Sequence, residues 1–241
     1  MCSVVALLRP GHAWPVLIAA NRDEKLDRAW DAPGPHWPGL IGGRDRSGGG
    51  SWMAMGGHGV VAAILNRPGS LGPEAGKRSR GELPLIAAAA PSAEQGVGRI
   101  MALPAREWRP FNMVVADSGA AFFLRGLGAG APEAMRLEAG VSMVTAHEPN
   151  DLESPRIRRH LPRFRATPPP EPDRQDWAGW EALLADRSQG EAGLAEALCV
   201  PPVQGFGTVC ASLVGLGAAG ARLWRFCPHP PGTAPFADLT L

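Results

Sequence analysis

The chain has 241 residues, enough for one large domain or two small ones with a substantial buried core. Its 24 lysines and arginines are balanced by 23 aspartates and glutamates, which excludes the strongly basic surface typical of a nucleic-acid-binding protein. No stretch approaches the roughly 20 consecutive apolar residues of a membrane-spanning helix, and residues 1–12 lack a basic leader. We therefore expect a cytoplasmic protein without an integral membrane segment or a nucleic-acid partner.

Short apolar runs bounded by turn residues predict β-hairpins early in the chain. Residues 3–8 and 16–20 form the first pair, joined by a segment that contains proline and glycine. Residues 29–50 are rich in proline and glycine without an apolar period, so we expect a long surface loop there. Residues 51–55 and 60–65 predict a second hairpin around a glycine-rich turn.

Helical patterns are concentrated in the middle of the chain, and strand patterns return after them. Helices are predicted over residues 79–90, 92–103 (with Ser92 as N-cap), 154–164 (interrupted or ended near Pro162) and in two stretches between about 177 and 198. Strands are predicted over residues 111–126 (a hairpin turning at 117–119), 140–146 and 208–226 (a closing hairpin).

Short turns between neighbouring strands favour antiparallel sheet, and the helices are segregated rather than alternating with the strands. The fold class is therefore α+β, with helices packed on antiparallel sheet. The proline-rich segment 166–175 has sheet-like sequence on both sides. We interpret it as an internal loop and predict a single domain over residues 1–241.

The four cysteines form no CxxC pair and have no histidine at metal-ligand spacing, so we expect free thiols and no metal site. Cys2 follows Met1 directly, and cells generally remove methionine before so small a residue. Removal would leave a thiol and an α-amine on one residue, and an amine with a pKa of about 7.7–8.0 can act as base for its own nucleophile. Alternatively, Cys2 is a small buried residue at the start of a strand.

Four polar residues follow the second predicted strand without a break: Asn21, Arg22, Asp23 and Glu24. If the first two strands pair as a hairpin, this quartet emerges beside Cys2. An arginine there depresses the thiol pKa, and a carboxylate can hold the α-amine. The alternative is a salt-bridged strand end in which Arg22 pairs with Glu24 or Asp45.

The second hairpin ends at Asn66, which is followed by Arg67. A side-chain amide at the end of a strand adjacent to Cys2 is a candidate oxyanion donor. Asn66 can equally be a turn-forming asparagine.

Five motifs occur in order: an initial Met-Cys, "AANRDE", "GGRDRSGGGSWMAM", "GVVAAILNRPG" and "SRGEL". Together they resemble the NRDE family, which includes transport and Golgi organisation protein two of animals. The match is dense over residues 1–85. Farther on, "SPRIRRHLPRF" and "FGTVCASLVGL" resemble the bacterial branch of the family.

The resemblance implies an N-terminal-nucleophile-type αββα sandwich, with mostly antiparallel sheets and helices on the outer faces. It is similar to the bile-salt hydrolase and penicillin V acylase group, and the positions that match that group's catalytic motifs are Cys2, Arg22, Asp23 and Asn66. Those hydrolases also place an asparagine after the threonine of a later strand and an arginine near the chain end. Here Ala146 and Val209 stand at these points, with Asn150 four residues after Ala146. These departures weaken the expectation of hydrolase chemistry.

Animal members of the family are implicated in haem export from mitochondria and in lipid or acyl-coenzyme-A homeostasis. The resemblance therefore implies a protein that binds and handles a small hydrophobic, acidic ligand, either haem or an acyl lipid, with no obligatory cofactor. The alternative is an N-terminal-cysteine amidohydrolase or thioesterase, so enzymatic activity is left open, as is the oligomeric state. The expected ligand-binding residues are Asn21, Glu24, Arg67, Trp30, Trp37, Cys227 and His229.

Two pairs of these residues have sequence reasons of their own, and one predicted helix offers further candidates. Cys227 precedes a proline and lies beside His229, a context seen at reversible haem sites, although a proline also simply ends a strand. Trp30 and Trp37 lie in the predicted loop, where they can cover a hydrophobic ligand. The arginines of the helix at 154–164 can bind a phosphate or carboxylate, or form a solvated helix face.

Overall fold

The computed structural model describes residues 2–241, whose contacts divide them into two compact units. The first unit combines the residues up to Asp27 with Glu138–Leu241, and the second is Arg28–Leu137. Each unit holds one antiparallel sheet with its own helices. The second unit is thus an insertion in the chain of the first, and the single-domain prediction stays a prediction.

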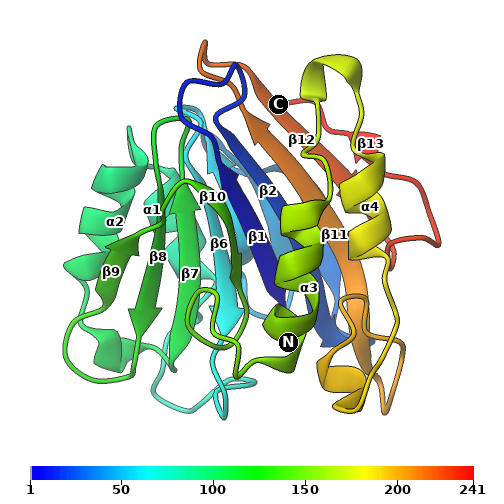
Figure 1. Ribbon diagram of the computed structural model, residues 1–241. Helices are drawn as coiled ribbons and strands as arrows, with labels where there is room; N and C mark the ends of the chain where they lie inside the picture. The colour runs from blue at the N-terminus through cyan, green and yellow to red at the C-terminus, as the bar shows by residue number, and fades with distance from the viewer. Residues whose placement is uncertain (1) are drawn as a thin grey trace. The chain divides into compact units, whose positions relative to one another are not determined.

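The first unit contains a six-stranded sheet in the order β10-β1-β2-β11-β12-β13. Its strands are β1 (Ser3–Leu8), β2 (Val16–Lys25), β10 (Gly140–Val144), β11 (Phe206–Leu216), β12 (Arg222–Cys227) and β13 (Ala237–Asp238). Figure 1 shows helices α3 (Pro155–Ala166) and α4 (Ala178–Leu184) in front of this sheet. The opening and closing hairpins predicted from sequence are both present, and β11 joins them by pairing with β2.

Alternation along β2 decides which side chains meet the helices. Leu17 and Ala19 are fully buried in one cluster with Ile157 and Phe164 of α3 and Trp180 of α4. Phe164 and Trp180 pack edge to face with ring centroids 5.4 Å apart. Because successive side chains of a strand point to opposite faces, the odd-numbered residues of β2 face the helices and the even-numbered ones face away.

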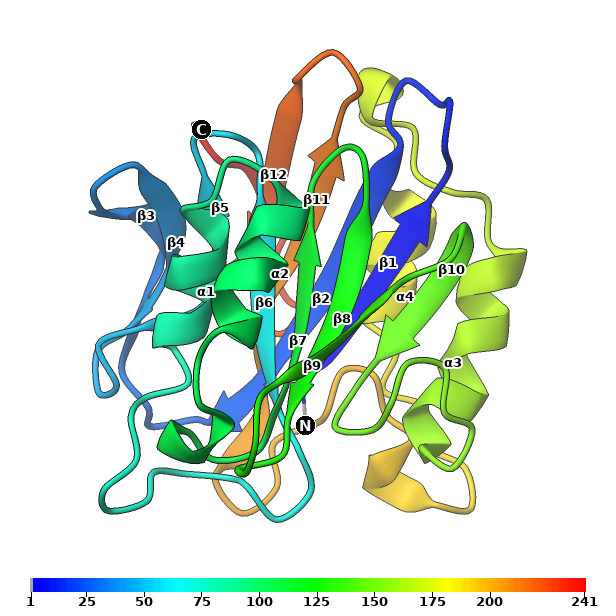
Figure 2. The ribbon, with the colours of Figure 1, turned by 90° about the vertical axis from the view of Figure 1, so that its left-hand side faces the viewer.

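The second unit contains a seven-stranded sheet whose strands follow one another in chain order. They are β3 (Trp30–Trp37), β4 (Leu40–Asp45), β5 (Ser51–Gly56), β6 (Val61–Asn66), β7 (Phe111–Ala116), β8 (Ala121–Gly126) and β9 (Glu133–Arg136). Figure 2 shows α1 (Glu82–Ala88) and α2 (Ala93–Met101) together on one face of this sheet. The predicted N-cap of α2 is confirmed, since the Gln95 amide donates to Ser92 Oγ at 3.2 Å.

The long surface loop predicted over residues 29–50 is wrong, because this segment contains β3 and β4. β3 is the outer strand of its sheet, and its pairing with β4 is interrupted by two register shifts. Prolines are tolerated on an edge strand because their missing N–H faces no ladder partner. The proline-rich composition therefore indicated a sheet edge rather than a loop.

The predicted interruption or end of α3 near Pro162 is also wrong, because the helix runs without a break to Ala166. An internal proline costs a helix about 3 kcal/mol through a lost hydrogen bond and a clash. The buried side chains of Leu161 and Phe164 lie on either side of Pro162 and pack into the core of the first unit. Tertiary packing thus outweighs the local cost.

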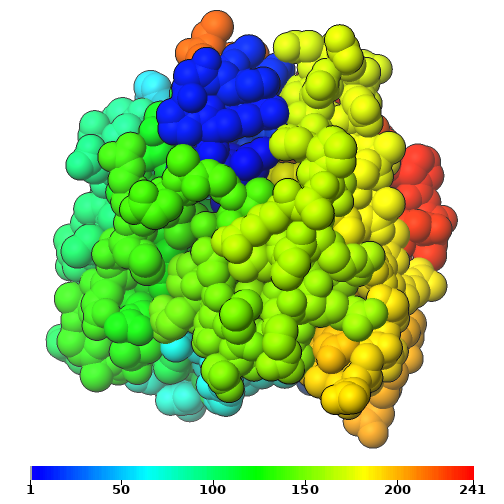
Figure 3. Space-filling view, viewed as in Figure 1, coloured from blue at the N-terminus to red at the C-terminus, as the bar shows by residue number. Residues whose placement is uncertain are grey.

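The proline-rich connector packs against the β1–β2 turn of the same unit. Arg9 Nη2 donates to the carbonyl of Pro170 at 3.1 Å, and Trp14 Nε1 donates to Asp173 Oδ1 at 2.9 Å. Figure 3 shows the blue turn beside the yellow-green segment on the surface. Within residues 2–241, no helix combines the length and apolar character required to traverse a bilayer. The cytoplasmic location stays a prediction.

His160 of α3 makes the first unit sensitive to mild acid. The ring is fully buried, with Nε2 at 2.8 Å from the Glu196 carbonyl and Nδ1 accepting from Arg163 Nη1 at 3.2 Å. Burial lowers the pKa of His160 from 6.5 to about 4. Because the folded-state pKa is depressed, this contribution to stability is complete above pH 6.5 and is lost as the pH falls toward 4. Its size is on the order of 2 kcal/mol.

We expect His160→Gln, whose amide can still donate to Glu196, to flatten the fall of the melting temperature between pH 6.5 and 4. Thermal melts of both proteins across this range provide the measurement. Parallel curves for the two proteins would contradict the assignment.

Candidate functional site

Cys2 lies where the opening hairpin was expected to place it, beside the polar quartet of β2. Ser3 pairs with Asn21 in the β1–β2 ladder. The Cys2 thiol lies 3.5 Å from the carbonyl oxygen of Asp23, to which it donates, and accepts from the Asp23 amide at 3.4 Å. Cys2 is half-buried. The thiol is therefore held by the backbone of the quartet rather than by its side chains.

The quartet lies inside β2, not after it, and its side chains divide between two faces. The expected strand end at Ala20 is wrong, since β2 continues to Lys25. Asn21 and Asp23 face the helices, whereas Arg22 and Glu24 face away. Arg22 is 6% exposed, and its Nη2 lies 3.7 Å from Glu24 Oε2. The strand-end salt bridge with Glu24 is thus present, and Asp45 forms an ion pair with Arg28.

Asp23 is the centre of a buried polar network on the helix-facing side. Its carboxylate is fully buried and accepts from Arg156 Nη1 at 2.8 Å and from Thr208 Oγ1 at 2.5 Å. Arg156 Nη1 also donates to Ser3 Oγ at 3.1 Å. The carboxylate therefore ties α3 and β11 to the start of the sheet. Sequence reasoning missed Arg156 and Thr208 as parts of this site.

Asn21 has a similar structural role. It is 1% exposed, and its Nδ2 donates to the carbonyls of Leu184 at 2.9 Å and Leu198 at 3.0 Å. These carbonyls follow α4 and precede β11. The amide thus anchors the helical segment onto β2, and the ligand-binding role expected for Asn21 stays a prediction.

The electrostatic environment of Cys2 differs from the expected one. Burial raises the pKa of the Cys2 thiol, and the negative charge of Asp23 raises it further. The opposing influence of Arg22 is smaller. Arg22 lowers the thiol pKa as expected, but the pKa is raised overall, because desolvation and the nearby carboxylate outweigh the guanidinium.

We nevertheless expect Cys2 to be alkylated first, for a different reason. Cys2 is half-buried, whereas Cys199, Cys210 and Cys227 are at most 1% exposed. Iodoacetamide labelling near neutral pH followed by peptide mapping should give modification of Cys2 before the other three. Faster labelling of any buried cysteine would contradict this order.

The haem context around Cys227 does not have the geometry of an axial ligand. Cys227 is fully buried in the apolar core, and its thiol donates to the carbonyls of His229 at 3.2 Å and Ala234 at 3.3 Å. Burial also raises the pKa of this thiol. His229 itself is exposed. These residues do not fit a haem, so we derive no chemistry through this pair.

Asn66 and Arg67 lie in the second unit, at the end of β6. Arg67 Nη1 donates to Asn112 Oδ1 at 2.6 Å, and the Arg67 amide donates to Ser70 Oγ at 3.0 Å. Asn66 pairs with Phe111 in the β6–β7 ladder and is half-buried. Arg67 thus closes a turn, and the oxyanion role of Asn66 stays a prediction.

Trp30 and Trp37 are strand residues rather than loop residues. Trp30 packs edge to face on Trp52, with ring centroids 5.6 Å apart. Trp37 packs against the apolar core of the second unit. Both are half-buried, and their role as a ligand cover stays a prediction.

The sequence that gives this arrangement matches one known protein family. The family model described as Transport and Golgi organisation 2 matches residues 1–165. The chain belongs to this family. None of the curated protein sequences that were compared matches it.

Solved structures share the fold of this family member at low sequence identity. Penicillin V acylase from Agrobacterium tumefaciens is 13% identical with a TM-score of 0.63, covering 99% of this chain and 86% of the acylase. The Caenorhabditis elegans ortholog of N-acylethanolamine-hydrolyzing acid amidase is 10% identical, with a TM-score of 0.55 and coverages of 88% and 92%. The C2A mutant of conjugated bile acid hydrolase from Clostridium perfringens is 10% identical, with a TM-score of 0.54 and coverages of 99% and 92%. These similarities confirm the predicted N-terminal-nucleophile-type α+β fold class.

The structure shows what Ala146 and Asn150 do in this family member, where the sequence departs from the hydrolases. Ala146 is fully buried and apolar. Asn150 adopts a left-handed φ of 60°. Its side-chain Oδ1 accepts from the backbone amide of Met143 at 2.9 Å, and its backbone amide donates to the Met143 carbonyl at 2.9 Å. Asn150 therefore closes the end of β10. Asn150 does not take the place of the asparagine that the hydrolases have at the position of Ala146.

The α3 arginines are mostly committed to protein partners rather than to an anion. Arg156 is buried against Asp23. Arg159 pairs with Glu196 at 3.1 Å, and Arg163 forms an ion pair with Asp186. Arg158 and Arg165 are exposed and donate to the carbonyls of Leu152 and Val141, so the solvated helix face is limited to part of the predicted run.

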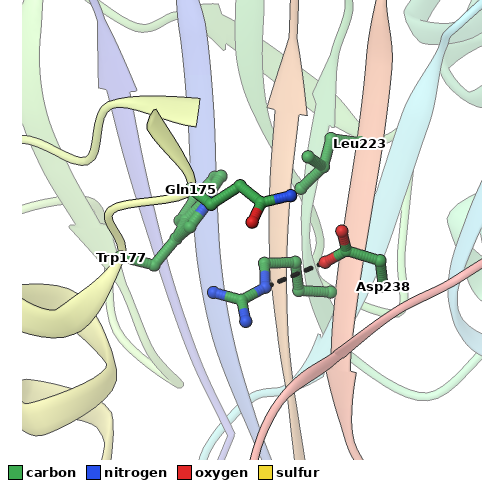
Figure 4. A pocket seen from close by; sticks show the side chains of 5 residues that line it. Gln175, Trp177, Leu223 and Asp238 are labelled. Carbon is green, nitrogen blue, oxygen red and sulfur yellow. Dashed lines mark hydrogen bonds and ion pairs between the residues drawn. The ribbon is translucent and has the colours of Figure 1, made fainter. Parts of the chain in front are cut away.

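One pocket of about 260 Å³ lies in the first unit, lined by Gln175, Trp177, Leu223, Arg225 and Asp238 (Figure 4). Arg225 donates from Nε to Asp238 at 3.0 Å and from Nη1 to Glu181 at 2.6 Å. The two carboxylates thus exceed its single positive charge. None of the site residues expected from sequence lines this pocket.

Proposed function

We propose that this family member binds a small hydrophobic, acidic ligand, an acyl lipid or acyl-coenzyme A or haem, and acts as a trafficking or homeostasis factor. The observation that carries the proposal is the division of the quartet between two faces of β2. The Asp23 carboxylate is engaged by Arg156 and Thr208 on the helix-facing side. The Cys2 thiol, whose pKa is raised, and the buried Arg22 guanidinium remain at the end of the hairpin. Such a site favours binding over turnover.

Arg22 is the residue of this site best suited to an anion. A guanidinium binds carboxylate and phosphate groups through paired hydrogen bonds of about 2.7–2.9 Å. Arg22 Nη2 lies 3.7 Å from Glu24 Oε2, at the end of the hairpin that carries Cys2. A haem propionate and the phosphates of coenzyme A share this chemistry.

The test is calorimetric titration with palmitoyl-coenzyme A, with coenzyme A lacking the acyl chain, and with haemin. Arg22→Met should weaken binding of the preferred ligand about 10–100-fold, because a charged hydrogen bond contributes about 1.5–3 kcal/mol. The control is Arg44→Met in the second unit, where Arg44 pairs with Asp31 on the surface. Equal affinities of wild type and Arg22→Met, or saturable binding of none of the three compounds, would overturn the proposal.

The second candidate is a cysteine amidohydrolase or thioesterase, which the contact of Cys2 with Asp23 and the fold shared with an acylase and an amidase favour. The thiolate would attack the acyl carbon, the leaving amine or thiol would depart with a proton, and water would hydrolyse the resulting thioester. Turnover of acyl-amide or acyl-thioester substrates that Cys2→Ala abolishes would support it. No turnover by protein whose intact mass confirms the loss of Met1 would exclude it for the panel tested.

A further inference from the structure

A single nitrogen of α3 holds both polypeptide segments that flank the Cys2 thiol. Arg156 is 5% exposed, and its Nη1 donates to Ser3 Oγ at 3.1 Å and to Asp23 Oδ2 at 2.8 Å. Ser3 is covalently bonded to Cys2, and the backbone of Asp23 contacts the thiol. The distance between these two segments therefore depends on Arg156.

A bulge in β11 completes the arrangement from the other side. Thr208 pairs with Asp23 and Cys210 pairs with Arg22, with a register shift between them. In a regular strand, residues two apart share a face, but the extra residue Val209 places Thr208 and Cys210 on opposite faces. Thr208 can thus bond the carboxylate while Cys210 lies beside Arg22. Bulges recur next to functional sites because they re-aim side chains in this way.

We propose that Arg156 is a positioning residue that sets the placement and the electrostatic environment of the Cys2 thiol from the opposite face of the sheet. The inference rests on the proposed function only in taking Cys2 as part of the ligand site. Arg156 acts through its hydrogen bonds to Ser3 and Asp23, which lie on the helix-facing side of the sheet. Its charge offsets that of Asp23, which otherwise disfavours the thiolate.

The charged and titratable groups around Cys2 fix the direction of the expected effect. Asp23 raises the thiol pKa, Arg22 lowers it, and Cys210 faces the same side of the sheet. Removing Arg156 takes away a positive charge that lies 2.8 Å from the Asp23 carboxylate and offsets it. The thiol should then titrate at a higher pH, and the thiolate fraction near neutral pH should fall.

The experiment measures the pH profile of iodoacetamide labelling of Cys2, read by peptide mapping, in protein whose intact mass is the same at the N-terminus for every variant. Arg156→Met should move the midpoint up by about one pH unit and slow labelling near neutral pH about tenfold. Arg156→Lys, which keeps the charge, should restore most of the profile. The control is Arg159→Met on the same helix, whose guanidinium bonds Glu196 and Ser188 instead. It should leave the profile unchanged.

The double variant Asp23→Asn with Arg156→Met keeps the test valid if Arg156→Met fails to fold, since removing both charges of a buried pair is often tolerated. Its profile should lie at or below that of wild type. An upward shift in the double variant, a shift of equal size in Arg159→Met, or an unchanged profile in folded Arg156→Met would overturn the inference. No ligand enters this assay, so failure of the proposed function alone would leave its result intact.

Discussion

Replacing Asp23 by alanine is expected to lower the free energy of unfolding by about 3–5 kcal/mol. The Asp23 carboxylate is fully buried, and Arg156, its partner at 2.8 Å, is 6% exposed at its side chain. Truncation leaves the guanidinium buried without its counter-charge and also removes the acceptor of the Thr208 hydroxyl. Breaking one side of a buried pair costs more than the pair itself contributes, because the remaining charge stays desolvated. Urea unfolding of wild type and variant measures the difference.

The matched control is Asp31→Ala in the second unit. Asp31 pairs with Arg44 at 2.6 Å, but its side chain is 26% exposed and that of Arg44 is 43% exposed. Water and salt screen such a pair, so the expected loss is about 1 kcal/mol or less. If the two variants lost equal stability, the Asp23 network would not be the buried anchor described above.

Gly56→Ala is expected to destabilise the protein by about 3 kcal/mol, at the upper end of the usual overpacking range. Gly56 ends β5 directly beneath α1, and a Cβ there would overlap the carbonyl oxygen of Ala88 at the end of that helix. The obstacle is backbone rather than a flexible side chain, so the helix itself must shift. The loss should appear in thermal melts as an earlier transition.

For an alanine at the neighbouring Gly57 we expect the opposite result. A Cβ at Gly57 meets nothing within 4 Å, and the residue is exposed. Gly57→Ala should therefore be neutral or stabilise by about 0.4–1 kcal/mol, because alanine restricts the unfolded chain. Similar melts for the two alanine variants would show that α1 does not pack closely on Gly56.

Local patterns were sufficient to predict several hairpins of this fold and the N-cap of α2. The apolar runs at 3–8 and 111–126 are bounded by turn residues, and both became paired strands. Ser92 precedes an amphipathic stretch, and its hydroxyl caps α2. These signals are local because the hydrogen bonds they describe join residues close in sequence.

The parts that were mispredicted depend on contacts between distant segments. The proline-rich sequence of β3 predicts a loop. That it forms an edge strand depends on the order of the whole sheet, which local sequence does not show. Arg156 was taken for one of several candidate anion-binding arginines because its partners, Ser3 and Asp23, lie far away in the chain. The division of the quartet between two faces required the register of β2, which sequence alone did not fix.

The sheet order of the first unit has a consequence for synthesis on the ribosome. β2 is an inner strand of the sheet only because β11 pairs with it. Asn21 can form its ladder pair only after Ala211 has been synthesised. At about 5–20 residues per second, roughly ten seconds or more pass before that partner exists. During this interval β2 has an open edge of unpaired N–H and C=O groups, on which a second nascent chain can add a strand. Synthesis that ends between residues 137 and 206 would therefore give a product prone to aggregation, even though the whole second unit had already been made.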